Sequence, residues 1–292
     1  MHQKQLTTKE VDMVENYRGV EDTPAFSKVI NKLRRFCLDK GFVEAHTQDR
    51  LSILAACEDP ETVATYEYMD ETWPLPQTGQ MWLEYELLTQ PDLPGVFCVS
   101  TSYRNEPDPV PGRHKLIFPM FEFEIQGGIK ELRAFETELL VYLGFGYQSD
   151  FHYQSYDDLA SFYETDELTH KHENKMQHDF GPVLFLENFP VYTSPFWNMK
   201  LSDKDHAHKI DVILHGHETI GSAERSSSVK EMKHEFYTIS EGKYAQKLFD
   251  LFGKDRVEAE LNQFLDLPFI PRSGGGIGVT RLINALRKGG LL

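Results

Sequence analysis

The sequence of 292 residues predicts an α+β fold in a single continuous domain. Segments with helical spacing and apolar runs typical of strands follow one another without the regular alternation of a doubly wound parallel sheet. Two of these runs lie on either side of a polar loop rich in proline and glycine, which favours antiparallel neighbours. Hydrophobic residues make up 40% of the chain, and no linker or internal repeat divides it. We therefore expect one domain over residues 1–292.

The first predicted helix covers residues 25–40. Its apolar side chains recur every three or four positions, and Gly41 follows as a C-terminal cap. The next two elements are strand candidates at 95–103 and 116–125. The polar loop between them, 107–112, is of a kind that is usually functional inside a compact domain.

The C-terminal half continues the mixture of helices and strands. Helical spacing predicts helices over 131–143 and 243–265, and buried apolar runs predict strands at 182–189 and 210–214. The last elements are a strand or loop at 269–272, a glycine-rich stretch at 273–279 and a terminal helix.

The composition of the chain indicates which binding partners and which cellular compartment to expect. Asp and Glu outnumber Lys and Arg by 46 to 30, and the formal charge of −16 disfavours tight nucleic-acid binding by this chain alone, because such binding neutralises phosphates with basic side chains. Three cysteines without a CxxC pair predict reduced thiols and no structural disulfide. No signal-peptide pattern and no run of roughly 18 apolar residues is present. We expect a cytoplasmic protein with no membrane partner.

The strongest chemical pattern surrounds the polar loop. Arg104 and Glu106 precede the loop on one strand face, and Arg113 and His114 follow it. A guanidinium binds phosphate, a carboxylate accepts from an amino group, and an aromatic ring such as Phe118 stacks on a base. Alone, Arg104 and Glu106 would be read as a surface ion pair. Together with the residues beyond the loop, they predict a nucleotide site.

The glycine-rich stretch 273–279 is a weaker pattern. No βαβ unit and no acid some twenty residues later follow it, which excludes a dinucleotide fingerprint, and no Gly-Lys-Ser/Thr sequence marks a P-loop. It predicts close backbone packing before a helix. The first turn of that helix carries Arg281, a cation that could bind phosphates. Read alone, it would be a structural strand with a surface arginine.

A third pattern pairs two acids. Asp211 and Glu218 flank a buried strand and turn, and carboxylate oxygens next to a nucleotide imply Mg²⁺. The alternative is a strand that ends in solvated charges.

These three segments, in this order, resemble the signature motifs of class II aminoacyl-tRNA synthetases, specifically the aspartyl/asparaginyl branch, over most of the chain. The resemblance implies an antiparallel β-sheet flanked by helices and a ligase that forms an aminoacyl-adenylate from an amino acid, ATP and Mg²⁺. Residues 26–47 resemble the dimer-forming motif 1, with Gln48 in place of the usual proline, which implies a homodimer.

The resemblance also assigns the nucleotide roles. Arg104 would hold the α-phosphate and the substrate carboxylate as a catalytic residue, and Glu106 would read the adenine amino group. Arg113 and His114 would touch the outer phosphates. Phe118 would stack on the adenine.

Three further roles follow in the same way. Arg281, the second catalytic residue, would cover the other face of the adenine and reach the γ-phosphate. Asp211 and Glu218 would bind Mg²⁺, and Glu218 would also contact ATP.

The amino-acid pocket would consist of Gln80, Glu84, Glu122, Ser222 and Arg225. In the family that arginine grips the side-chain oxygen of aspartate or asparagine. Glu84 lies in a segment where aspartyl enzymes carry a lysine, and a carboxylate beside Arg225 complements an amide, so asparagine is favoured over aspartate. Glu122, where aspartyl enzymes usually have Asp, agrees with this choice.

Departures from the family leave alternatives open. Ile117 and Met120 replace polar residues, so the substrate could be another amino acid. The N-terminal anticodon-binding barrel of full-length enzymes is expected to be missing, which with the charge of −16 argues against independent recognition of tRNA. Core-only relatives include archaeal asparagine synthetase-related proteins that use an aspartyl-adenylate and elongation-factor-modifying lysyl paralogs. The acceptor could be tRNA, ammonia, an amine or a protein, and a non-catalytic paralog that binds nucleotide or amino acid is a further alternative.

Overall fold

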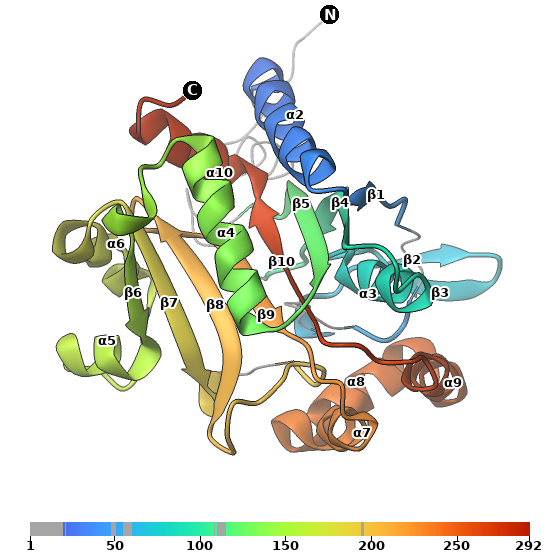
Figure 1. The fold of residues 1–292 in the computed structure, drawn as a ribbon. Coiled ribbons are helices and arrows are strands. Elements are labelled where there is room, and N and C mark those ends of the chain that lie inside the picture. Colours follow the sequence, from blue (N-terminus) through green and yellow to red (C-terminus); the bar gives the residue numbers. More distant parts are fainter. Residues whose placement is uncertain are drawn as a thin grey trace, which may run out of the picture.

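The computed structural model describes residues 20, 22–47, 51–54, 60–107, 109, 115–193 and 196–292. In this part of the chain eight strands form one sheet in the order β1-β4-β5-β10-β9-β8-β7-β6 (Figure 1). The strands of this sheet are β1 (Val43–Glu44), β4 (Gly95–Tyr103), β5 (Ile117–Gln126), β6 (His152–Ser155), β7 (Val183–Pro190), β8 (His206–Leu214), β9 (His217–Glu224) and β10 (Arg272–Gly278). A separate hairpin consists of β2 (Thr65–Tyr68) and β3 (Glu71–Pro74). The pairs β1–β4 and β6–β7 are parallel and the other neighbours are antiparallel, which confirms the predicted α+β class.

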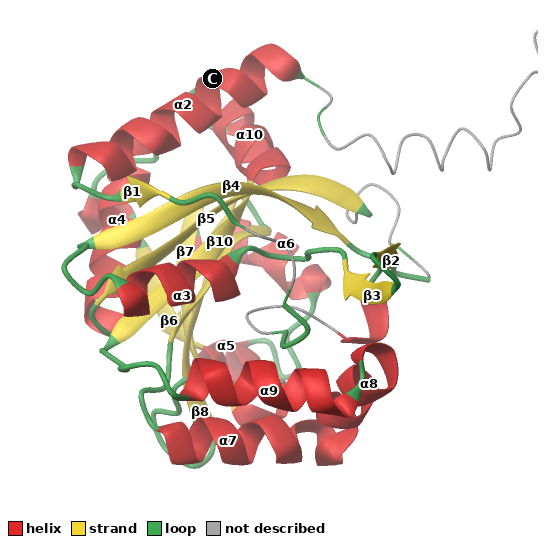
Figure 2. Cartoon of the chain, turned by 90° about the vertical axis from the view of Figure 1, so that its right-hand side faces the viewer, coloured by secondary structure: helices red, strands yellow, loops and turns green. Residues whose placement is uncertain are grey.

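Helices cover both faces of the sheet (Figure 2). One face carries α2 (Thr23–Asp39), α4 (Ile129–Leu143) and α10 (Val279–Lys288). The other carries α3 (Gln80–Thr89), α5 (Tyr156–Phe162), α6 (His170–Phe180), α7 (Val229–Thr238), α8 (Lys243–Phe252) and α9 (Lys254–Leu265). None of the helices described is long and apolar enough to span a bilayer.

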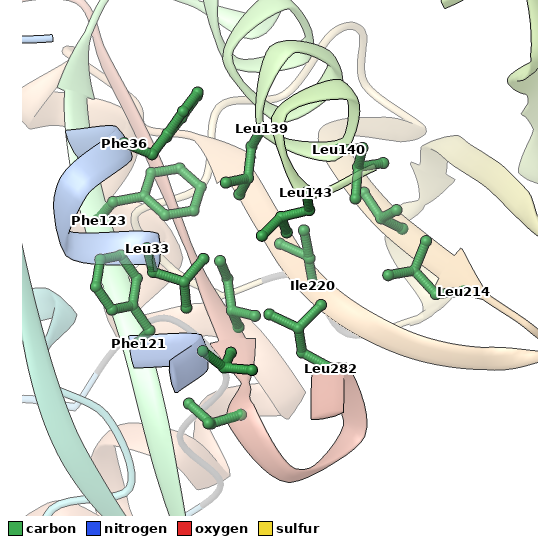
Figure 3. Close-up of a cluster of buried hydrophobic side chains, with 14 of the residues drawn as sticks. Leu33, Phe36, Phe121, Phe123, Leu139, Leu140, Leu143, Leu214, Ile220 and Leu282 are labelled. Carbon is green, nitrogen blue, oxygen red and sulfur yellow. The ribbon is translucent and has the colours of Figure 1, made fainter. Parts of the chain in front are cut away.

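The main hydrophobic core lies between the sheet and the group α2, α4 and α10. Figure 3 shows side chains from these helices and from β5, β8 and β9 in contact, among them Leu33, Phe36, Phe121, Phe123, Leu139, Leu140, Leu143, Leu214, Ile220 and Leu282. Burial of this apolar surface is the dominant stabilising contribution in a domain of this kind.

Alternation along β5 leaves polar groups on the opposite face of the sheet. Phe121 and Phe123 point into the main core, so Glu122 and Glu124 point toward α3. The same rule applies to β10, where Ile277 enters the core and Gly276 faces the other way. This second face carries the candidate site.

The predicted helix at 25–40 is confirmed as α2. Asp22 caps it by accepting a hydrogen bond from the Ala25 amide at 2.9 Å, and Gly41 follows its end with a φ of +79°, a conformation that favours glycine. The predicted strands at 95–103, 116–125, 182–189 and 210–214 are confirmed as β4, β5, β7 and part of β8, and the helix at 131–143 as α4.

One prediction about the C-terminal quarter is wrong and one is confirmed. The single helix expected over 243–265 is two helices, because Gly253 adopts a φ of +85° between α8 and α9. The close backbone packing predicted for the glycine-rich stretch is confirmed, since β10 runs unbroken from Arg272 to Gly278 between β5 and β9 and leads into α10. Its glycines allow this close packing: a β-carbon on Gly274 would overlap the carboxylate of Glu124.

Candidate nucleotide and amino-acid site

A cavity of about 540 Å³ lies on the second face of the sheet, over β5, β9 and β10. The N-terminal end of α3 borders it, and so do α10 along its length and the segment that follows β4. It gathers six of the predicted site residues, namely Gln80, Arg104, Glu106, Phe118, Glu218 and Arg281. Arg113, His114 and Gln48 lie outside the described residues.

The cavity is cationic although the chain carries a formal charge of −16. Its described lining includes five basic side chains, Arg104, Lys115, Arg281, Arg287 and Lys288. The acidic side chains in the same lining are Glu106 and Glu218. A basic cleft in an acidic protein concentrates anions locally, which suits a polyphosphate ligand.

The end of β4 positions Arg104. The Arg104 amide donates to the Leu116 carbonyl at 2.8 Å, so the residue extends the pairing of β4 with the chain that leads into β5. Its guanidinium carbon lies 5.5 Å from the centre of the Phe118 ring, and Nη1 lies 3.7 Å from Oε1 of Glu106. Its Nε is buried without a hydrogen-bond partner among the described residues. An anion in the cavity could supply that partner.

Arg281 approaches from the first turn of α10. Its Nη1 donates to the Glu218 carbonyl at 2.8 Å and lies 3.7 Å from Oε2 of the same residue. This contact ties α10 to the turn that begins β9. Arg281 and Phe118 therefore line one cavity from different elements.

The two predicted metal ligands face a common point. A β-carbon on Gly221 would lie 3.3 Å from Oε1 of Glu218 and 3.5 Å from Oδ1 of Asp211, so the glycine leaves open the space that both oxygens border. Oδ1 of Asp211 is buried without a hydrogen-bond partner in the described structure, while Oδ2 accepts from Nζ of Lys209 at 2.8 Å. Burial raises the pKa of Asp211 to about 7, against the lowering effect of Lys209.

This donor set fits a hard divalent cation bound together with other oxygen ligands. Mg²⁺ is usually held by one or two carboxylates plus phosphate and water oxygens. Among the described residues no group of three or more His, Cys, Asp or Glu side chains is arranged to hold a metal on its own. The two carboxylates would therefore need oxygens from a bound nucleotide.

Glu122 fixes the start of α3. It is fully buried, and burial raises its pKa. Its oxygens accept from the Gly79 amide at 2.8 Å, from the Ser100 hydroxyl at 2.5 Å and from the Thr78 hydroxyl. Glu122 thus lies behind the cavity lining and holds Thr78 in it.

Arg225 and Glu84 lie close together, as the sequence predicts, but behind the cavity lining. Nε of Arg225 is 3.7 Å from Oε1 of Glu84, and Nη2 of Arg225 donates to Oε1 of Gln80 at 2.5 Å. Both side chains are fully buried. Gln80, which lines the cavity, separates Arg225 from it.

Sequence reasoning missed two partners of these residues. Glu84 accepts from Nε and Nη2 of Arg272 at 2.9 and 2.6 Å, and Glu124 accepts from Nε and Nη2 of Arg225, both at 3.2 Å. Period-two alternation along β10 places Arg272 on the same face as Gly274 and Gly276, and this signal could have identified it.

Ser222 points away from the cavity. Its neighbour Gly221 lines the cavity, and adjacent residues of a strand face opposite sides of the sheet. The Ser222 hydroxyl donates to the Ile210 carbonyl at 3.2 Å on the side covered by α4. Ser222 therefore does not line the cavity.

Comparisons with known proteins point to one family. The family model described as tRNA synthetases class II (D, K and N) matches residues 3–289. The aspartate–tRNA(Asp) ligase of Pyrobaculum aerophilum is 29% identical over 121 residues, which are 41% of this chain and only 25% of that protein.

Solved structures show the same fold at low identity. The asparaginyl-tRNA synthetase of Pyrococcus horikoshii complexed with asparaginyl-adenylate superposes with a TM-score of 0.75 at 19% identity, over 96% of this chain and 67% of that one. The corresponding Entamoeba histolytica enzyme with asparaginyl-adenylate gives a TM-score of 0.70 at 17% identity, over 98% and 69%.

Proposed function

Because this chain belongs to the class II tRNA synthetases of the D, K and N group, we propose that it activates an amino acid with ATP, forming an aminoacyl-adenylate and releasing pyrophosphate. The observation that carries the proposal is the cationic cavity, which brings Arg104, Phe118 and Arg281 together in an acidic chain. The substrate carboxylate would attack the α-phosphorus. It needs no general base, because it is already ionised at neutral pH.

The residues of the cavity would act by positioning and by charge stabilisation. Arg104, with its unpartnered buried Nε, would bind the α-phosphate and the substrate carboxylate. Glu106 would accept from the adenine amino group, and the ring of Phe118 and the guanidinium of Arg281 would enclose the base. Contacts of Arg113 and His114 with the outer phosphates stay predictions.

Mg²⁺ is the proposed cofactor, with Asp211 and Glu218 as its protein ligands. The partnerless Oδ1 of Asp211 and the open space at Gly221 support this assignment. When bound, the ion would neutralise phosphate charge that develops as pyrophosphate leaves.

We propose asparagine as the first candidate substrate and aspartate as the second. The family model, and a fold shared with a synthetase solved with asparaginyl-adenylate, support this pair. The acceptor of the activated acyl group is a separate question, with tRNA, ammonia, an amine and a protein as the candidates. A cytoplasmic location stays a prediction from the cysteine content.

A homodimer through α2 is part of the proposal. Exposed apolar side chains lie on α2, β1 and α4, namely Leu38, Val43, Val141 and Tyr142. An apolar surface of this kind suits contact with a second copy of the chain.

Amino-acid-dependent ATP–pyrophosphate exchange tests the activity. We expect exchange with asparagine when all twenty amino acids and Mg²⁺ are offered. Arg104→Ala should lower the rate at least about 100-fold, the usual cost of removing one charge-stabilising donor. Lys243→Ala, which removes an exposed cation outside the cavity, is the control. No exchange with any amino acid, or an Arg104→Ala rate equal to that of the unmodified protein, would contradict the proposal.

A further inference from the structure

Four fully buried charged side chains meet behind the part of the cavity that Gln80 lines. Glu84 comes from α3, Glu124 from β5 and Arg272 from β10, and Arg225 directly follows β9. We call them the buried quartet. Their side chains have no solvent exposure, so each charge depends on the others for compensation.

The pairing inside the buried quartet is specific. Arg272 donates two hydrogen bonds to Oε2 of Glu84, and Arg225 donates to both oxygens of Glu124. The remaining oxygen of Glu84, Oε1, accepts from Nδ2 of Asn198 at 2.7 Å. Two carboxylates and two guanidinium groups therefore cancel, and the buried quartet has no net formal charge.

Gln80 connects the buried quartet to the cavity. Its Oε1 is held by Arg225, and its Nε2 lies beside Gly276, where a β-carbon would come within 3.2 Å of it. The Met120 side chain lies over the same glycine. Gln80, Met120 and Gly276 all line the cavity, so the surface presented here is uncharged.

We propose that Arg272 sets the side-chain specificity of the activation site. Arg272 forms an ion pair with the Glu84 carboxylate, so the charges of the two side chains cancel. No excess positive charge then lies near Gln80 to balance an acidic substrate side chain. The site then accepts an amino acid with a short, uncharged polar side chain and rejects aspartate. This inference rests on the proposed function and differs from direct recognition of a substrate amide by Glu84, since Arg272 and Asn198 occupy that carboxylate.

The test compares binding of two non-hydrolysable sulfamoyl adenylates, asparaginyl and aspartyl, by titration calorimetry. The unmodified protein should prefer the asparaginyl analogue at least about tenfold, or about 1.4 kcal/mol. Glu84→Gln leaves Arg272 without a counterion, so the affinity ratio should shift toward the aspartyl analogue at least about tenfold. Glu84→Gln combined with Arg272→Gln restores neutrality, and the original ratio should return.

The double variant also protects the test against misfolding, because it leaves no uncompensated buried charge. Glu86→Gln, on the same helix and not buried, is the matched control and should keep the original ratio. Thermal unfolding of each variant reports on its fold.

The outcomes separate the two proposals. If the unmodified protein binds neither analogue, the proposed function fails and the specificity inference fails with it. If the unmodified protein binds the aspartyl analogue as tightly as the asparaginyl one, the specificity inference alone is wrong. The specificity inference alone is also wrong if Glu84→Gln weakens only the binding of the asparaginyl analogue and the double variant does not restore that binding. Glu84 would then contact the substrate directly.

Discussion

Glu136 offers a quantitative test of the structure that does not depend on a ligand. It lies on α4 with no solvent exposure, and neither carboxyl oxygen has a partner in hydrogen-bonding geometry among the described residues. The nearby Ser222 hydroxyl already donates to the Ile210 carbonyl. The pKa of Glu136 is raised from its ordinary 4.5 to about 8, mainly by burial and to a lesser extent by the charges of Asp211 and Glu187, against the lowering effect of the Ser222 hydroxyl. Glu136→Gln keeps the shape of the side chain and removes the charge.

The sign of the effect follows from proton binding. Because the folded protein holds the Glu136 proton more tightly than the unfolded chain, stability is fully present below pH 4.5 and is lost as the pH rises toward about 8. One pKa unit corresponds to about 1.4 kcal/mol, so this group costs the unmodified protein about 3 kcal/mol at pH 7 and about 1 kcal/mol at pH 5. Glu136→Gln carries no charge and avoids this loss of stability. The free energy of unfolding of the variant, relative to that of the unmodified protein, should therefore increase from pH 5 to pH 7.

Urea unfolding of both proteins at pH 5 and pH 7 measures this difference. Other titrating groups are shared, so their contributions cancel in the comparison. Glu138→Gln, on the same helix with a 60% exposed side chain, is the control and should show no comparable pH dependence. An equal effect of Glu136→Gln at both pH values, or a loss of stability at pH 7, would refute the reasoning.

Two glycine substitutions test the site itself. Gly221→Ala puts a β-carbon 3.3 Å from the nearer carboxylate oxygen of the proposed Mg²⁺ site, so the Mg²⁺ concentration for half-maximal pyrophosphate exchange should rise at least about tenfold; an unchanged Mg²⁺ dependence would remove that role. Gly274→Ala would displace the Glu124 carboxylate from its arginine and should lower the melting temperature by several degrees in thermal unfolding. Gly278→Ala, whose β-carbon has no contact under 3.7 Å, is the control for the second measurement, and equal shifts for the two variants would contradict the packing argument.

Local sequence signals identified part of the fold, whereas β1, β2, β3, β6, β9, α3, α5, α6 and α7 were not predicted. Long apolar runs and a capped amphipathic pattern identified β4, β5 and α2, because each element buries its own periodic face. The break at Gly253 was missed because helical periodicity continues on both sides of it. A glycine inside such a pattern was itself the available signal.

The candidate site was predictable where site residues lie close together in the sequence. Arg104 and Glu106 line the cavity together, although the prediction that they share a strand face is wrong, because β4 ends at Tyr103 and both residues lie in the segment that follows it. The pair Glu84 and Arg272 was not predictable in this way, since 188 positions separate the two residues. Ser222 was misassigned although alternation from Gly221 already placed it on the other face.

The position of β10 in the sheet has a consequence for the order in which the protein is made. Within the described sheet, β10 alone joins the block β1, β4 and β5 to the block β6 to β9. The ribosome completes β10 after every other strand, so until then β5 and β9 each present an open edge. Their pairing with β10 also spans long sequence separations, which slows folding. The part of the cavity that β10 lines therefore forms only after β10 has been synthesised and has paired with both of these edges.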